Sequence, residues 1–312
     1  MIHTNHLWVL GASGYVGGAL TRSLLFTKLP NEVITTLGHR NFSFEKLEKT
    51  NLLVGRLEQF DFSWLRIFPP SVVFHCARLA GSTTAKRGKA SQKGLRANNE
   101  WISSLEKLQS PPIVVYCSGT LMYGNQVASA DEDTPLNPIA YARQYVQAEK
   151  PWVDYRGVKL DVRVARPAWI IGPDSWFLHF FVKPALQYGF VPFYGDGSQR
   201  MSLLHVEDCG GLLQHIYRNG SRNENYNLFI FDPITQKHFS EVVAKHLGLP
   251  TRQISESEVV NKYGKTVWEA LSSDIPVTTK HKDWFESYTP QYANLEDMIC
   301  AVVNDIRLNF RL

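Results

Sequence analysis

The chain has 312 residues, of which 44% are hydrophobic and 20% are charged, and its formal net charge at pH 7 is +4. These values are ordinary for a soluble globular protein and exclude disorder as the default. The small excess of positive charge is spread along the chain, so we expect the protein to bind neither nucleic acid nor a membrane. The remaining expectation is a small-molecule substrate.

The amino-terminal segment and the cysteines indicate a cytoplasmic protein. Residues 1–6 are polar and lack the basic start and apolar stretch of a secretion signal. No apolar run reaches the ~20 residues that span a bilayer. Cys76, Cys117, Cys209 and Cys300 show no metal-ligand spacing, so we expect reduced, mostly buried thiols and no bound metal.

Apolar runs that alternate with helical patterns predict an α/β fold with a parallel sheet. A buried strand is expected at 6–10, followed by a glycine turn and a helix at 15–26. Further strands are expected at 33–37, 52–54, 71–75, 113–117 and 160–165. The stretches between them have crossover length, which makes the strands parallel and places the ligand beyond their carboxyl ends.

Two domains are expected. Residues 1–167 form the dinucleotide-binding domain, which residues 205–230 rejoin, and residues 168–312 form mainly a substrate-binding domain. The second begins with a segment rich in aromatic residues, from Trp169 to Tyr194, broken by Gly and Pro. These rings either line an apolar pocket or form an ordinary core.

The strongest motif is LWVLGASGYVGGAL, where an apolar strand turns into a helix. Gly11 permits the tight turn, Gly14 lets the backbone approach a pyrophosphate, and Gly17 lets helix and strand pack closely. The amide groups and dipole of the helix N-terminus then hold the phosphates. The predicted cofactor-binding residues of this turn are Gly11, Ser13, Gly14, Tyr15, Val16 and Gly17.

The end of the second strand bears on the choice of cofactor. An acidic residue that binds a ribose 2′-hydroxyl is expected about twenty residues after the glycines, and the segment TTLGHRN has none. Arg40, with His39 beside it, instead offers positive charge for a 2′-phosphate. We therefore predict NADP as the cofactor, with NAD as the second choice.

Five further segments accompany the glycine turn: SVVFHCARLAG, VVYCSGTLMYG, AYARQYVQAEK, RPAWIIGP and SLLHVEDC. With them the chain resembles the extended short-chain dehydrogenases/reductases, the superfamily of NAD-dependent epimerases and dehydratases, over essentially its whole length. The resemblance implies a doubly wound Rossmann sheet with a smaller carboxyl-terminal substrate-binding domain. It also leaves a homodimer open as the assembly.

In that superfamily the tyrosine of YxxxK is the acid/base, and the lysine binds the nicotinamide ribose and eases loss of the tyrosine proton. Tyr141 matches the tyrosine, but Tyr145 stands where the lysine belongs, while Glu149 keeps a later acidic position. On one continuous helix Lys150 would face away from Tyr141. An unassisted tyrosine donates a proton at neutral pH but is a poor base, so reduction should suffer less than oxidation.

The hydroxyl that orients the substrate oxygen is also displaced. Counted back from Tyr123, the family's Ser/Thr position falls on Gly119. Ser118 is the preferred substitute and Thr120 the second, because a bulge at the strand end could turn either inward. Both could equally be tied to the backbone.

Other segments extend the resemblance to the cofactor and the substrate. Cys76 and Ala77, after the fourth strand, and Pro167 and Trp169, in RPAWIIGP, are expected beside the cofactor. In GDGSQRMSLLHVEDC the position of a phosphate-binding arginine falls on Met201, with Arg200 one residue early. Neighbouring residues of an extended segment face opposite ways, so Arg200 could point away from the phosphates. This weakens the case for a nucleotide-sugar substrate without excluding it.

Five basic residues after the fourth strand are expected to form a solvated loop, or else to close over an acidic substrate: Lys86, Arg87, Lys89, Lys93 and Arg96.

Three functions are consistent with these patterns. The first is an NAD(P)-dependent reductase in which Tyr141 protonates a carbonyl oxygen that Ser118 or Thr120 orients. The second is a nucleotide-sugar epimerase or dehydratase with tightly held NAD. The third is a dinucleotide-binding protein without chemistry, which the missing lysine suggests.

Overall fold

The computed structural model describes residues 4–39, 49–81, 83–155 and 157–310. Contacts divide the chain into two compact units, and the chain passes between them several times. Residues 119–143, expected from the sequence in the first domain, group with unit 2. Unit 1 comprises Met1–Ser118, Gln144–Arg166 and Cys209–Tyr226, and unit 2 comprises Gly119–Arg143, Pro167–Asp208 and Asn227–Leu312.

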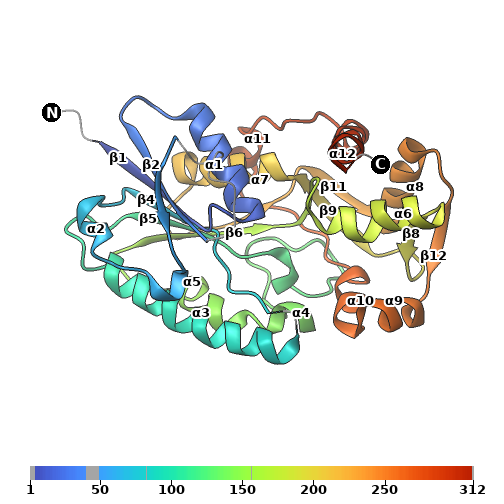
Figure 1. Ribbon diagram of the computed structural model, residues 1–312, viewed down its shortest axis with the longest axis horizontal. Coiled ribbons are helices and arrows are strands. Elements are labelled where there is room, and N and C mark those ends of the chain that lie inside the picture. The colour runs from blue at the N-terminus through green and yellow to red at the C-terminus, as the bar shows by residue number, and fades with distance from the viewer. Residues whose placement is uncertain (1–3, 40–48, 82, 156, 311–312) are drawn as a thin grey trace. The chain divides into compact units, whose positions relative to one another are not determined.

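Unit 1 is built on a seven-stranded sheet with the order β10-β6-β5-β4-β1-β2-β3 (Figure 1). The pairs from β6 to β3 are parallel, and the order reverses beside β1, as in doubly wound dinucleotide-binding folds. Its strands, of which β6 and β10 end in unit 2, are β1 (Asn5–Leu10), β2 (Glu32–Gly38), β3 (Asn51–Val54), β4 (Val72–His75), β5 (Ile113–Cys117), β6 (Asp161–Pro167) and β10 (Asn225–Leu228).

The helices of unit 1 follow the strands as crossovers. They are α1 (Tyr15–Thr27), η2 (Leu57–Gln59), α2 (Trp64–Ile67), α3 (Thr84–Leu105), α5 (Val146–Val153) and most of α7 (Val206–Asn219).

Helix α3 corrects one expectation. The basic run from Lys86 to Arg96 is helical rather than a loop, because Thr83 caps α3 by accepting a hydrogen bond from the Lys86 amide. Helices α3 and α5 pack closely, since a Cβ on Gly94 would lie 2.9 Å from that of Ala148.

The core of unit 1 gathers around large aromatic side chains. Trp8, Trp101 and Trp152 are all buried, and the Trp101 ring stacks on Phe60 with centroids 4.6 Å apart. Apolar side chains from the strands complete this cluster, so the sheet is a rigid platform for the loops at its carboxyl edge.

Unit 2 has two small sheets and a larger share of helix. Its sheets have the orders β11-β9-β7 and β12-β8. The strands are β7 (Trp169–Ile171), β8 (Val191–Tyr194), β9 (Arg200–His205), β11 (Phe231–Thr235) and β12 (Thr251–Ile254). The helices are η3 (Thr120–Met122), α4 (Ala140–Arg143), η4 (Leu178–Val182), α6 (Lys183–Tyr188), α8 (Gln236–Leu247), α9 (Glu256–Tyr263), α10 (Lys265–Leu271), α11 (Lys282–Glu286) and α12 (Leu295–Phe310).

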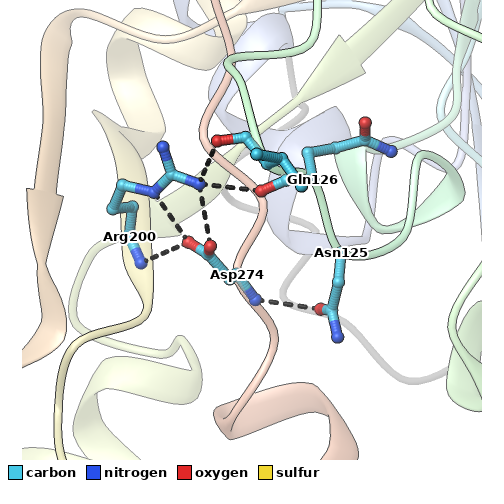
Figure 2. A pocket seen from close by; sticks show the side chains of 5 residues that line it. Asn125, Gln126, Arg200 and Asp274 are labelled. Atoms are coloured by element: carbon cyan, nitrogen blue, oxygen red, sulfur yellow. Dashed lines mark hydrogen bonds and ion pairs between the residues drawn. The ribbon is translucent and has the colours of Figure 1, made fainter.

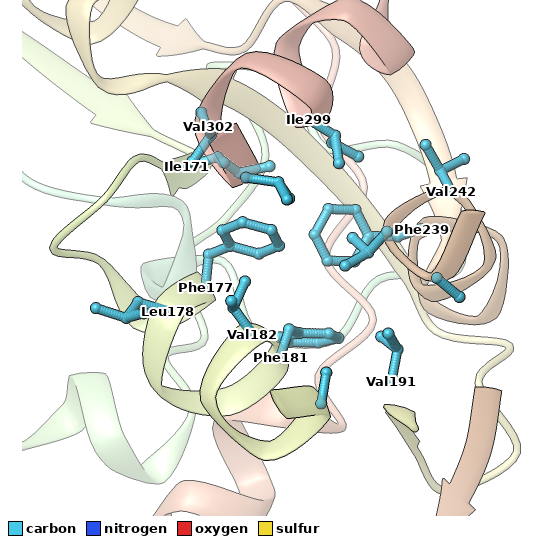
Figure 3. Packing of buried hydrophobic residues seen from close by; sticks show 14 of the residues in the cluster. Ile171, Phe177, Leu178, Phe181, Val182, Val191, Phe239, Val242, Ile299 and Val302 are labelled. Carbon is cyan, nitrogen blue, oxygen red and sulfur yellow. The ribbon is translucent and has the colours of Figure 1, made fainter. Parts of the chain in front are cut away.

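The core of unit 2 consists of packed phenylalanine rings and aliphatic side chains (Figure 3). Phe177, Phe181 and Phe239 are fully buried, and the Phe181 and Phe239 rings meet edge to face with centroids 5.1 Å apart. Ile299 and Val302 of α12 pack against the same cluster. Several rings of the aromatic-rich segment therefore form a core.

Candidate functional site

The glycine turn has the geometry that a diphosphate-binding loop needs. Gly11 ends β1 with φ +82°, and a Cβ there would lie 2.8 Å from the Cα of Ala77. A Cβ on Gly17 would lie 2.2 Å from the Gly11 carbonyl oxygen. Only glycine allows these approaches, and Gly14 caps α1 without a side-chain hydrogen bond. The backbone at the N-terminus of α1 therefore fits a dinucleotide diphosphate.

The neighbouring end of β2 lies against this turn. The His39 amide donates a hydrogen bond to the Ser13 hydroxyl at 3.1 Å. Gly38 and His39 supply no carboxylate for a ribose 2′-hydroxyl, and Arg40 lies outside the described residues. Ser13 and His39 thus lie together, whereas their role in cofactor binding and the choice between NADP and NAD stay predictions.

Two thiols end neighbouring strands of unit 1. Cys76 follows β4 and Cys117 ends β5, and both are free. A hydrogen bond to Cys117, together with burial, raises the pKa of the Cys76 thiol well above its ordinary value. Such a thiol is a weak nucleophile, which fits packing beside the glycine turn better than catalysis.

Ser118 is hydrogen-bonded within unit 1. Its hydroxyl donates to Oε2 of Glu149 at 2.5 Å, and Glu149 is buried on α5. Burial raises the pKa of Glu149, while the bond from Ser118 and the charges of Arg78 and Arg166 act in the opposite direction. The site thus contains a buried carboxyl group, Glu149, at the later acidic position that the family resemblance also shows.

Tyr145, at the position of the family's lysine, is buried, and the guanidinium of Arg78 lies 4.4 Å from the centre of its ring. Lys150 forms an ion pair with Asp154 on α5. Arg78 lies within the segment SVVFHCARLAG, but the sequence assigns it no role because its contact with Tyr145 depends on packing between distant segments.

The remaining predicted residues belong to unit 2. Tyr141 lies on α4 and is half-buried. The Thr120 hydroxyl donates to the Pro167 carbonyl at 3.3 Å, and the ring of Trp169 packs on that of Trp176 with centroids 4.6 Å apart. Gly119 has extended backbone, and a Cβ there would meet only the Pro167 oxygen, at 3.9 Å. The roles assigned to Tyr141, Ser118 and Thr120 stay predictions.

A pocket of about 520 Å³ in unit 2 contains Arg200 (Figure 2). The guanidinium forms a two-pronged ion pair with Asp274, with its Nη2 2.8 Å from Oδ2, and also donates to the carbonyls of Gln126 and Val127. Met201 is buried. Arg200 is thus engaged by the protein itself, and its partner Asp274 lies 74 residues further along the chain, too far for any local pattern to reveal.

A buried histidine completes the carboxyl edge of β4. The Asn98 amide group donates to the Ala148 carbonyl, which leaves its oxygen to accept a bond of 2.9 Å from Nε2 of His75. Burial lowers the pKa of His75 to about 4, so the ring is neutral at physiological pH. It links β4 to α3 and α5 rather than serving as a base.

Within the residues that the structure describes, no three His, Cys, Asp or Glu side chains gather as a metal site. None of the helices found there has the length and apolar character needed to cross a membrane.

The fold and the glycine turn define a dinucleotide-binding protein of the extended short-chain type. The chain belongs to the NAD dependent epimerase/dehydratase family, whose sequence model matches residues 7–228. This is an enzyme family, and the match agrees with the resemblance drawn from the motifs.

Two curated relatives and two solved structures resemble the chain. Protein YeeZ of Escherichia coli is 24% identical over 147 residues, which cover 47% of this chain and about half, 50%, of YeeZ. The uncharacterized UDP-glucose epimerase YtcB of Bacillus subtilis is 25% identical over 226 residues, covering 64% of this chain and 69% of YtcB.

The two structures share the fold over nearly their whole length. A UDP-N-acetylglucosamine 4-epimerase from Methanobrevibacter ruminantium, in complex with UDP-N-acetylmuramic acid, has a TM-score of 0.78 at 18% identity, covering 99% of this chain and 100% of its own. A dTDP-glucose 4,6-dehydratase from Bacillus anthracis, in complex with NAD, has a TM-score of 0.75 at 15% identity, covering 99% and 98%.

Proposed function

We propose that the chain is a nicotinamide-dinucleotide-dependent reductase of a small carbonyl compound. The observation that carries this proposal is the glycine turn, where Gly11 and Gly17 allow backbone approaches that any Cβ would block. They form the tight connection from β1 to the N-terminus of α1, the kind of backbone that binds a diphosphate. The end of β2 offers no carboxylate there, so we favour NADP over NAD. The cofactor, when bound, supplies hydride to the carbonyl carbon.

The chain's own residues would manage the proton. Tyr141 donates its phenolic proton to the carbonyl oxygen, which becomes the hydroxyl of the product, and solvent restores the proton. No lysine lies four residues later to ease deprotonation, so the donor direction is favoured. Because the Ser118 hydroxyl donates to Glu149, it can only accept a further bond, such as one from the product hydroxyl.

The test combines binding with turnover. Calorimetry with NADPH, NADP, NADH and NAD should show that the protein binds dinucleotide, with higher affinity for NADPH and NADP than for NADH and NAD. Tyr141→Phe should reduce carbonyl turnover by about 10²- to 10⁴-fold without changing cofactor affinity, whereas Tyr188→Phe, a tyrosine elsewhere in unit 2, should change neither. If no dinucleotide binds to the folded protein, the proposal is wrong; binding without turnover of any substrate would favour a non-catalytic binder.

A second candidate is a nucleotide-sugar epimerase or dehydratase with tightly held NAD. It is favoured by the family match and by relatives and solved structures that carry such names. The engagement of Arg200 by Asp274 speaks against it, because that guanidinium is committed to the protein. Denaturing the purified protein and identifying the released nucleotide separates the two, since stoichiometric NAD would support this candidate.

A further inference from the structure

Arg78 is an anchored cation whose N–H groups make no hydrogen bond with the described residues. Its guanidinium lies 4.4 Å from the centre of the buried Tyr145 ring. Elsewhere in the described part of the chain, no hydrogen bond or ion pair of this group is found, and the residue is exposed. A guanidinium has five N–H donors, so Arg78 can bind an anion or hydroxyl groups from solution.

Arg78 is also attached to the backbone that lies against the glycine turn. A Cβ on Gly11 would lie 2.8 Å from both the Cα and the amide nitrogen of Ala77. Arg78 is the next residue, at the carboxyl edge of β4 where the strand order of the sheet reverses. In doubly wound folds that edge binds the dinucleotide.

A buried carboxyl group on α5 favours a positive charge at this place. Arg78 acts to lower the pKa of Glu149, against the effect of burial. It also opposes the rise that burial and Glu149 cause in the pKa of Tyr116. Tyr145 and Glu149, both fixed by packing, therefore hold Arg78 by ring contact and by charge.

We propose that Arg78 is a dinucleotide-binding residue, donating hydrogen bonds to the ribose or phosphate oxygens of the cofactor and supplying the positive charge that no lysine supplies four residues after Tyr141. The proposal rests on the proposed function, because it requires that a dinucleotide binds at the glycine turn. Lys150 cannot provide this charge, since it is paired with Asp154.

Calorimetric titration of NADPH and NADH tests the proposal. For the cofactor that the wild type binds more tightly, Arg78→Ala should lower the affinity by about 10- to 100-fold, because a charge-assisted hydrogen bond is lost. Arg78→Lys should restore part of the affinity. A higher salt concentration should lower the cofactor affinity of the wild type more than the cofactor affinity of Arg78→Ala, because salt screens the charge that the variant lacks.

Arg66→Ala is the matched control, because Arg66 is an exposed arginine of the same unit on α2, which precedes β4. It should leave affinity unchanged. The inference is overturned if Arg78→Ala binds as tightly as Arg66→Ala while the wild type binds well. A wild type that binds neither cofactor refutes the proposed function instead. If Arg78→Ala does not fold, Arg78→Gln takes its place with the same expected loss.

Discussion

Two arginines, one in each unit, stand in opposite relations to the protein around them. Arg200 of unit 2 has its donors taken by Asp274 and by two backbone carbonyls (Figure 2). Arg78 of unit 1 lies over the face of a ring and near a buried carboxyl group, and no described residue accepts a hydrogen bond from it. An arginine can therefore be a structural tie or a binding group, and the availability of its donors separates the two.

The two units also differ in the side chains that they bury. Beside the carboxyl edge of its sheet, unit 1 buries groups that titrate, among them His75 on β4 and Glu149 on α5. The centre of unit 2 consists of Phe177, Phe181, Phe239 and their aliphatic neighbours. Buried titratable groups cost stability, and they gather where chemistry or binding needs them. Unit 2 also buries titratable groups, among them His205 and Asp208. The buried groups of unit 1 support the proposal that its ligand binds at that edge of the sheet.

The largest expected effect concerns the apolar core of unit 2. Phe181→Ala should lower the free energy of unfolding by about 3–5 kcal/mol, because Phe181 is fully buried among other rings and leaves a cavity. Urea unfolding followed by tryptophan fluorescence measures it. Phe26→Ala, at a side chain that is 92% exposed, should change stability by no more than about 0.5 kcal/mol. Similar losses in both variants would contradict the core assignment.

The second-largest expected effect is a pH dependence of stability that arises from His75 in unit 1. The pKa of His75 is about 4 in the folded protein, below its ordinary value of 6.5, so the neutral ring stabilises the fold above pH 6.5. That contribution is lost as the pH falls from 6.5 toward 4 and amounts to about 3 kcal/mol.

His75→Gln removes this titration while keeping a donor for Asn98. Its stability should therefore fall less steeply than that of the wild type over the same pH range, in urea unfolding at successive pH values. Parallel slopes for the two proteins would show that His75 does not carry the pH dependence.

The smallest effect concerns Arg200. Its ion pair with Asp274 is about one-third exposed, so solvent screens it, and Asp274→Asn should lower stability by about 1 kcal/mol or less. Dinucleotide affinity should not change. Arg78→Ala should show the reverse pattern, with lost affinity and little lost stability. Equal effects of the two variants on cofactor binding would remove the distinction between the arginines.

Much of unit 1 could be predicted because its strands are continuous apolar runs. The strand expected at 113–117 coincides with β5, and the one expected at 33–37 is one residue shorter at each end than β2. The glycine turn was predicted because its steric demands leave a pattern in the sequence. The apolar spacing of Ala97, Trp101 and Leu105, four residues apart, could also have revealed α3 behind its basic residues.

The side-chain partners could not be predicted, because each depends on packing between distant segments. Arg78 meets a ring 67 residues further along the chain, and Ser118 meets Glu149 across 31 residues. Neither pair has a local pattern. The sequence therefore indicated that the lysine was missing, but it contained no sign of which cation lies beside its replacement.

Gly119 shows that the backbone retains capacity for another chemistry. Its extended conformation suits any residue, and the nearest atom to an added Cβ would be at ordinary contact distance. A serine introduced there would therefore meet no steric obstacle. A Gly119→Ser protein would thus carry a hydroxyl at the position where the family resemblance expects one, on an unchanged backbone.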